Sequence, residues 1–179
     1  KITQTSDKGL ATKNAAIAFK TRVYLHQRDW DKVIAEGSKI SSAFSLTPNP
    51  NDPFVTEANF TNSESIFSIK HGKASGQNPG PNGALASQYK SRRLVCISPI
   101  IWNNSSWLAD DKRRAEGTMV ETVAGIKYTN KYKDGTGLSD AAPVIRYAEV
   151  VLNMAEAFAR KATPDLTKAL TLLNSVRDR

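Results

Sequence analysis

The sequence predicts a mainly α-helical domain of tetratricopeptide-like hairpins, with an irregular, partly β lobe inserted between them. Apolar residues recur at helical spacing in two pairs of segments, one near each end of the chain, and only a short break separates the members of each pair. Between the pairs, residues 45–142 contain many turn-forming residues and only short strand-like runs. We therefore expect one domain over residues 1–179.

The first predicted hairpin covers residues 10–44. Apolar side chains recur every seven residues in its first half and also occupy the adjoining i+3 and i+4 positions. Thr12 precedes this pattern and Asp29 precedes the next, so each is expected to cap a helix. Because almost no loop lies between the two helices, they should run antiparallel.

The second predicted hairpin covers residues 143–179 and begins with PVIRYAEVVLNMAEAFAR, residues 143–160. On a helical wheel its polar side chains fall within one arc of roughly 80°. We therefore expect a helix packed on most sides, with Leu152 inside. The polar side chains are expected to pair at i+3 and i+4 or to cap neighbouring elements; they are Arg146, Glu149, Asn153, Glu156 and Arg160.

The closing helices of the two hairpins match each other. Asp29-Trp30-x-Lys32 aligns with Asp165-Leu166-x-Lys168. Thr163 is expected to cap the second of them, with Pro164 at the first helical position. Helical pairs of about 34 residues that repeat are typical of tetratricopeptide-like units. Two short matches can also arise by coincidence, because any two amphipathic helices share a pattern.

The intervening segment, residues 45–142, is too long to be a bare connection, so we expect it to face the ligand. Residues 62–69 predict a turn followed by a short buried strand. Residues 119–123 and 126–132 predict two strands that turn at Ala124-Gly125.

Composition narrows the class of protein. The chain of 179 residues has a formal charge of +8, 40% hydrophobic residues and no apolar run that approaches the ~20 residues of a bilayer-spanning helix. The positive charge suggests nucleic acid as a possible partner. However, the lysines and arginines are scattered along the chain and no nucleic-acid-binding motif accompanies them, so we expect no nucleic-acid partner. Cys96 lies in an apolar run and is expected to be buried. The chain ends at Arg179 within a helical pattern, which favours a fragment.

A catalytic or metal-binding set is not recognisable. His26 and His71 stand in unrelated contexts, and no phosphate-binding or dinucleotide motif is present, so neither a metal nor a cofactor is expected. Asp110-Asp111 allows a paired-carboxylate interpretation. Adjacent side chains rarely point at one substrate, so we expect Asp110 to cap a helical turn and Asp111 to pair locally. The sequence thus favours a protein that is not an enzyme.

The candidate ligand-binding residues are aromatic and amide side chains of the insertion. A pyranose stacks its C–H face on an indole, while its hydroxyls pair with amides. The alternative is that the tryptophans anchor the core of an irregular lobe. The candidates are Trp102, Trp107, Tyr89, Asn103 and Asn104.

Short motifs in a fixed order resemble the SusD/RagB family of bacterial outer-membrane nutrient-binding lipoproteins. Their order and spacing span nearly the whole chain. The motifs are Gly9-Leu10-Ala11-Thr12, Asp29-Trp30, Asn62-x-Glu64-Ser65-Ile66-Phe67, Asp110-Asp111-Lys112-Arg113, Pro143-x-Ile145-Arg146-Tyr147-Ala148-Glu149 and Leu173-Asn174-x-Val176-Arg177.

This resemblance implies non-catalytic capture of glycans or other nutrients at the cell surface, with a TonB-dependent, SusC-like transporter as partner. It implies a lipid anchor in the outer membrane and a longer protein, of which this chain would lack the N-terminal anchor and the C-terminal part. It assigns no ligand residue, because the matching motifs look architectural. The alternatives are a tetratricopeptide-like interaction scaffold without sugar binding, and a glycoside hydrolase, for which a convincing acid and nucleophile pair is missing.

Overall fold

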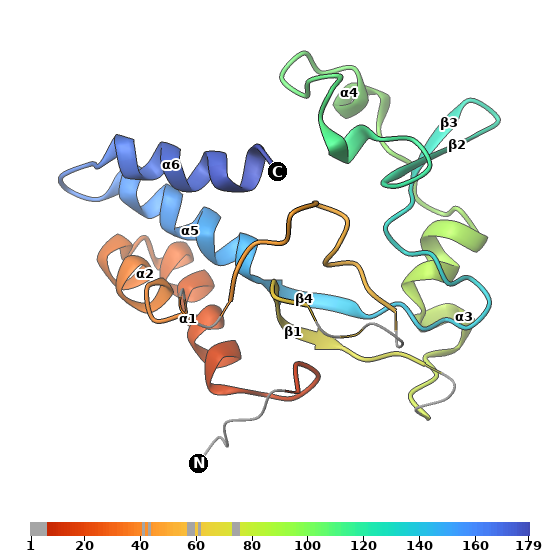
Figure 1. Ribbon diagram of the computed structural model, residues 1–179, viewed down its shortest axis with the longest axis horizontal. Helices are drawn as coiled ribbons and strands as arrows, with labels where there is room; N and C mark the ends of the chain where they lie inside the picture. The colour runs from red at the N-terminus through yellow and green to blue at the C-terminus, as the bar shows by residue number, and fades with distance from the viewer. Residues whose placement is uncertain (1–6, 41, 43, 57–59, 61, 73–75) are drawn as a thin grey trace. The chain divides into compact units, whose positions relative to one another are not determined.

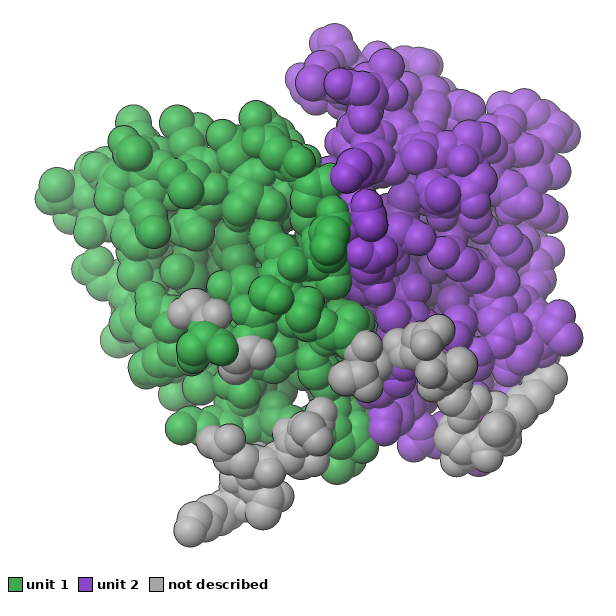
Figure 2. All heavy atoms as spheres, viewed as in Figure 1, with its two compact units in different colours: residues 1–48, 61–68, 143–179 green, residues 49–60, 69–142 purple. Residues whose placement is uncertain are grey.

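A computed structural model of the chain describes residues 7–40, 42, 44–56, 60, 62–72 and 76–179. Positions 41 and 43 of the first predicted hairpin, and positions 57–59, 61 and 73–75 of the predicted insertion, lie outside the described residues. The chain divides into two compact units, coloured in Figure 2: unit 1 is residues 1–48, 61–68 and 143–179, and unit 2 is residues 49–60 and 69–142. The fold class is confirmed, with helical hairpins in unit 1 and short helices and strands in unit 2. In the described part of the chain, no helix is long and apolar enough to cross a bilayer.

Helices α1 (Lys13–Gln27) and α2 (Trp30–Gly37) form the first hairpin, shown in red and orange in Figure 1. The predicted caps are confirmed: the side chains of Thr12 and Asp29 each accept a hydrogen bond from the backbone N–H three residues later, at 3.0 and 3.3 Å. Arg28 ends α1 in the left-handed conformation, with φ 60°, so the chain reverses at once. The second helix is shorter than the sequence pattern predicted.

The second hairpin begins four residues later than predicted. Helix α5 spans Tyr147–Arg160, whereas Ala142–Arg146 form strand β4, which pairs with β1 (Ser65–Ile69) in a two-stranded sheet. The β-branched Val144 and Ile145 favour extended structure. The predicted helix was therefore wrong over its first four residues, where pairing with β1 decides the conformation.

Helix α6 (Leu166–Arg177) is capped by Asp165, not by Thr163 as predicted. The Asp165 carboxylate accepts a hydrogen bond from the Lys168 N–H at 2.9 Å. Its own N–H donates to the Phe158 carbonyl at 2.9 Å, so the chain is still in the connecting turn at Asp165 and helix cannot start at Pro164. Asp165 thus has the same capping role as its sequence counterpart Asp29.

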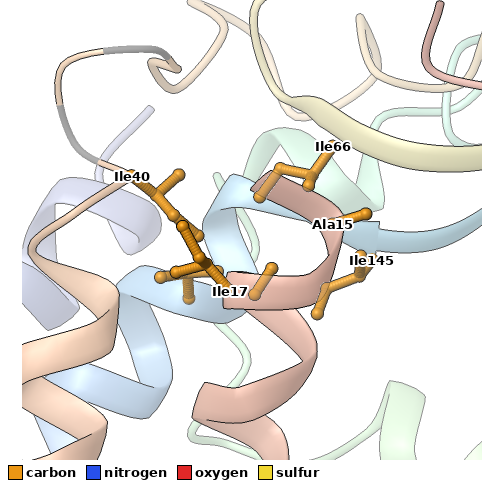
Figure 3. Packing of buried hydrophobic residues seen from close by; sticks show 7 residues of the cluster. Ala15, Ile17, Ile40, Ile66 and Ile145 are labelled. Carbon is orange, nitrogen blue, oxygen red and sulfur yellow. The ribbon is translucent and has the colours of Figure 1, made fainter. Parts of the chain in front are cut away.

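The core of unit 1 forms where both hairpins meet the two-stranded sheet. Helix α5 contacts α1, α2 and α6. Figure 3 shows side chains of α1, of the segment after α2, and of β1 and β4 converging on one cluster. Its labelled members are Ala15, Ile17, Ile40, Ile66 and Ile145.

The outer side of the second hairpin is more exposed than predicted. Leu152 of α5 is 38% exposed, whereas Val150, two residues earlier, is fully buried. Leu166, Leu170 and Leu173 of α6 are also exposed. Helix α5 is therefore packed by α1, α2 and α6 but leaves one apolar edge open, because no element among the described residues of unit 1 covers it.

Polar side chains of α5 pair mainly with another helix instead of with one another. Glu149 accepts two hydrogen bonds from Arg22 of α1, at 2.6 and 2.8 Å. The Asn153 amide donates to the Thr21 hydroxyl at 3.1 Å. Only the Glu156–Arg160 pair, at 2.8 Å, follows the expected i+4 spacing. These contacts orient α5 on α1.

A fully buried carboxylate, Glu64, joins distant parts of unit 1. It accepts hydrogen bonds from Arg146 Nη1 at 2.6 Å, Arg179 Nη2 at 3.2 Å and the Thr47 hydroxyl at 2.9 Å, and Arg179 Nη1 forms a further close pair with it. Burial by itself raises the pKa of Glu64. The hydrogen bonds and charges of Arg179 and Arg146 outweigh that effect and hold the pKa below its ordinary value.

Unit 2 is built from short elements. Strands β2 (Val120–Val123) and β3 (Ile126–Thr129) form an antiparallel hairpin. Its turn residues Ala124 and Gly125 both have positive φ, 51° and 79°, as a tight two-residue hairpin requires. The predicted strand pair and its turn are thus confirmed, although the second strand ends at Thr129, three residues earlier than predicted. The remaining elements are α3 (Gly80–Gly83), the π-helix η2 (Ser87–Ser91), α4 (Pro99–Trp102) and the 3₁₀-helix η3 (Lys112–Arg114).

Cys96 is exposed, so the prediction that it is buried was wrong. Its apolar neighbours Leu94, Val95 and Ile100 are exposed as well. An apolar run is buried only where another apolar surface faces it, and within unit 2 the segment instead borders an open cavity.

Substitutions at two nearby apolar positions of α5 should affect stability differently, because one position is buried and the other lies on the open edge. Val150→Asp should abolish cooperative unfolding, because it places a charge in the core without a partner. Leu152→Asp should change the free energy of unfolding by no more than about 1 kcal/mol. Urea titration followed by circular dichroism measures both. Equal losses in the two variants would contradict the described packing.

Glu64→Gln should lower the free energy of unfolding at neutral pH by about 3 kcal/mol, because it leaves two arginines beside a neutral amide in a buried site. Since the folded-state pKa lies below the ordinary 4.5, the carboxylate stabilises the fold above about pH 4.5, and this contribution is lost as the pH falls further. Wild type should therefore lose stability more steeply than the variant between about pH 5 and pH 3 in urea titrations. Glu156→Gln, at a half-exposed pair, is the control and should behave like wild type. Parallel pH dependence of wild type and Glu64→Gln would refute the role given to this carboxylate.

Candidate functional site

The two insertion tryptophans lie together in unit 2. Trp102 ends the one-turn helix α4, and its N–H donates to the Ser98 carbonyl at 2.9 Å. The following turn is closed by the Asn104 carbonyl, which accepts a hydrogen bond from the Trp107 N–H at 3.0 Å. It brings the two indoles edge to face, with ring centroids 5.6 Å apart and an interplanar angle of 74°.

Asp111 holds Trp107 in this position. Its carboxylate accepts a hydrogen bond from the Trp107 Nε1–H at 3.1 Å and from the Arg113 backbone N–H at 2.7 Å, which caps η3. The expected cap was Asp110, which is exposed instead. Because Asp111 points back to Trp107, the two adjacent aspartates do not form a paired-carboxylate site.

Two cations lie against the Trp102 ring. The Arg114 guanidinium carbon is 4.2 Å from its centroid and 5.3 Å from that of Trp107. The Lys127 Nζ is 4.4 Å from the Trp102 centroid. A backbone hydrogen bond from the Ile97 N–H to the Lys127 carbonyl, at 2.7 Å, ties the segment before α4 to strand β3, which places the lysine there. Cation–π contacts of this length are worth about 0.5–2 kcal/mol each.

A cavity of about 420 Å³ opens beside this cluster. Its wall combines one face of aromatic and apolar groups with an amide and an ammonium group. A cavity of this size fits one or two sugar rings. Its lining residues are Cys96, Ile97, Pro99, Trp102, Asn103, Gly125, Ile126 and Lys127.

The other predicted site residues lie differently. Tyr89 is in η2, where its ring packs on Tyr132 with centroids 5.4 Å apart, and Tyr132 in turn meets Phe54 at 6.0 Å. Tyr89 therefore belongs to a second aromatic group and does not line the cavity. The Asn104 side chain accepts a hydrogen bond from the Ser106 N–H at 2.8 Å and so shapes the turn between the tryptophans.

The sequence did not indicate Arg114 or Lys127 as site residues. Arg114 belongs to a basic cluster and Lys127 to a predicted strand, so no local sequence pattern marked either residue as part of a binding site. Their place depends on the η3 cap and on the pairing of the Ile97 segment with β3. Among the residues that the structure describes, no group of three or more His, Cys, Asp and Glu side chains is arranged to hold a metal ion.

The chain matches a known protein family. The model of the SusD family matches residues 14–179. No curated protein matches the chain.

Solved structures share the fold. A SusD superfamily protein from Bacteroides fragilis is 30% identical with a TM-score of 0.77, and one from Bacteroides thetaiotaomicron is 23% identical with a TM-score of 0.78. A laminarin-binding SusD-like protein is 19% identical with a TM-score of 0.69. Each comparison covers 99% of this chain but only 40%, 43% and 49% of the respective structures. The chain thus spans less than half the length of these proteins.

Removing the carboxylate of Asp111 should loosen the tryptophan pair without unfolding the chain. Asp111→Ala takes away the Trp107 partner and the cap of η3, which should cost about 1 kcal/mol. Acrylamide should then quench tryptophan fluorescence more strongly than in wild type. Asp110→Ala, at the exposed neighbouring position, should leave the quenching unchanged. Unchanged quenching in Asp111→Ala would contradict the described arrangement.

Proposed function

The chain belongs to the SusD family, and on that premise we propose that it captures glycans at the cell surface without breaking bonds in them. The cavity beside Trp102 and Asn103 is the observation that carries this proposal. Indole surface packs against the C–H face of a sugar, and the Asn103 amide can donate to and accept from its hydroxyls. Laminarin binding by a structural neighbour supports glycans as the ligand class.

Family membership also supports a wider setting for this binding. We propose that the full-length protein is lipid-anchored at the bacterial outer membrane and passes its glycan to a TonB-dependent, SusC-like transporter. In this proposal Trp102 and Asn103 contact the sugar, whereas Trp107 positions Trp102 and Arg114. Tyr89 belongs to the second aromatic group, whose contribution to glycan binding a separate variant can measure.

A specific observation favours a second function, that of a protein-interaction scaffold. The open edge of the second hairpin forms an apolar groove of about 520 Å³ in unit 1. Grooves of this kind accept amphipathic helices in other recognition systems. Its exposed leucines are Leu152, Leu166, Leu170 and Leu173.

Trp102→Ala should weaken glycan binding at least about tenfold, equivalent to about 1.4 kcal/mol. Affinity electrophoresis of the folded protein through gels that contain laminarin, dextran, pectin or other polysaccharides measures the effect. Trp30→Ala, which removes the same side chain from α2 in unit 1, is the matched control, and Tyr89→Ala tests the second aromatic group. If no polysaccharide retards the wild-type protein, the proposed glycan binding is wrong and the interaction-scaffold function is favoured instead.

Alkylation of the single cysteine of the chain, Cys96, can report where a glycan binds. Cys96 is exposed and lines the cavity, so a bound glycan should slow its alkylation by iodoacetamide. Trp102→Ala should lose this protection at the same glycan concentration. Retardation in the gel without protection of Cys96 would place the glycan elsewhere on the chain.

A further inference from the structure

The Trp102 ring is not a bare aromatic platform, because two cations already lie close to its centroid. Arg114 and Lys127 lie 4.2 and 4.4 Å from its centroid. A neutral sugar that stacks on a ring face covered by one of these cations must displace or share that cation, at a cost comparable with the cation–π contact itself. A sugar that carries a negative charge can keep both contacts and add hydrogen bonds to the cations.

Neither cation is neutralised by the protein. Among the described residues, no carboxylate lies within ion-pair distance of Arg114 or Lys127. Arg114 donates from Nη1 to the Trp107 carbonyl at 2.5 Å, and its buried Nε–H has no acceptor. Within the described part of the chain, the Lys127 ammonium group donates to the Thr122 hydroxyl, at 3.1 Å, which leaves two of its three N–H donors for an anion.

Three carboxylates of this part of unit 2 are paired with other donors, and that of Asp110 is exposed. Asp111 binds Trp107 and Arg113. Glu116 accepts from the backbone N–H and the hydroxyl of Thr122, at 2.5 and 3.0 Å. Glu121 pairs with Arg93 at 3.5 Å. None of these three carboxylates is therefore paired with Arg114 or Lys127, and of these two cations Lys127 lines the cavity.

We propose that the cavity binds an acidic sugar, one that carries a carboxylate or a sulfate group, that Lys127 receives its anionic group, and that Arg114, against the same indole, adds positive charge nearby. This inference rests on the proposed glycan binding. Hydrogen bonds between a cation and an anion are about twice as strong as neutral ones, and here the indoles hold the cations in place before the ligand arrives. Lys127 lines the cavity directly, whereas Arg114 lies against both indoles and is not a lining residue.

Matched polysaccharide pairs test the proposal with the intact chain. Dextran sulfate against dextran isolates the sulfate, and polygalacturonate against its fully methyl-esterified form isolates the carboxylate. We expect the anionic member of at least one pair to bind at least about tenfold more tightly, and the difference to shrink as salt is raised. Lys127→Gln should remove most of that preference, and Arg114→Gln should act in the same direction.

The net charge of +8 requires a control for non-specific attraction. Lys13→Gln removes one exposed positive charge from α1 in unit 1 and should change binding less than twofold. A loss as large in Lys13→Gln as in Lys127→Gln would overturn the proposal, as would equal binding of the charged and uncharged members of both pairs. In the latter case neutral glycan binding would stand. Failure to bind any polysaccharide would instead reject the proposed function itself.

Discussion

The buried carboxylate of Glu64 is the point at which separate passages of unit 1 are fastened together. It accepts hydrogen bonds from Thr47, which follows the first hairpin, from Arg146 at the end of β4, and from Arg179 after α6. Its own backbone carbonyl accepts a hydrogen bond from the Tyr147 N–H at 2.8 Å, at the start of α5. A buried charge is tolerated only when its partners are all in place. The start of α5 and the end of α6 are thereby fixed relative to β1.

The tryptophan cluster of unit 2 is assembled by a series of hydrogen bonds. A one-turn helix presents Trp102, a short turn returns Trp107 to it, and Asp111 both caps η3 and holds the second indole. Pairing of the Ile97 segment with β3 adds Lys127. Each device satisfies backbone or side-chain polar groups, so the geometry of the aromatic and cationic groups follows from hydrogen bonding more than from apolar packing.

These features give the two units different properties as binding surfaces. Unit 1 offers an apolar edge along α5 and α6 with few polar groups, which suits contact with another apolar surface. Unit 2 offers a cavity lined by the Trp102 indole, the Asn103 amide and the Lys127 ammonium group, which suits a polar ligand with an apolar face. Family membership and the cavity of unit 2 together favour glycan binding over a scaffold role.

The sequence by itself determined the helical hairpins, their caps at Thr12 and Asp29, the tight turn at Ala124-Gly125 and the family. These depend on local patterns, such as a side-chain oxygen before an apolar periodicity or two turn residues between strand-like runs. Only the tertiary structure decided that residues 142–146 form a strand, that Asp165 caps α6, and that Cys96 and Leu152 are exposed. It alone placed Arg114 and Lys127 on Trp102 and set Tyr89 apart. Strand pairing, burial and cation–π contacts join residues far apart along the chain, so no local pattern could specify them.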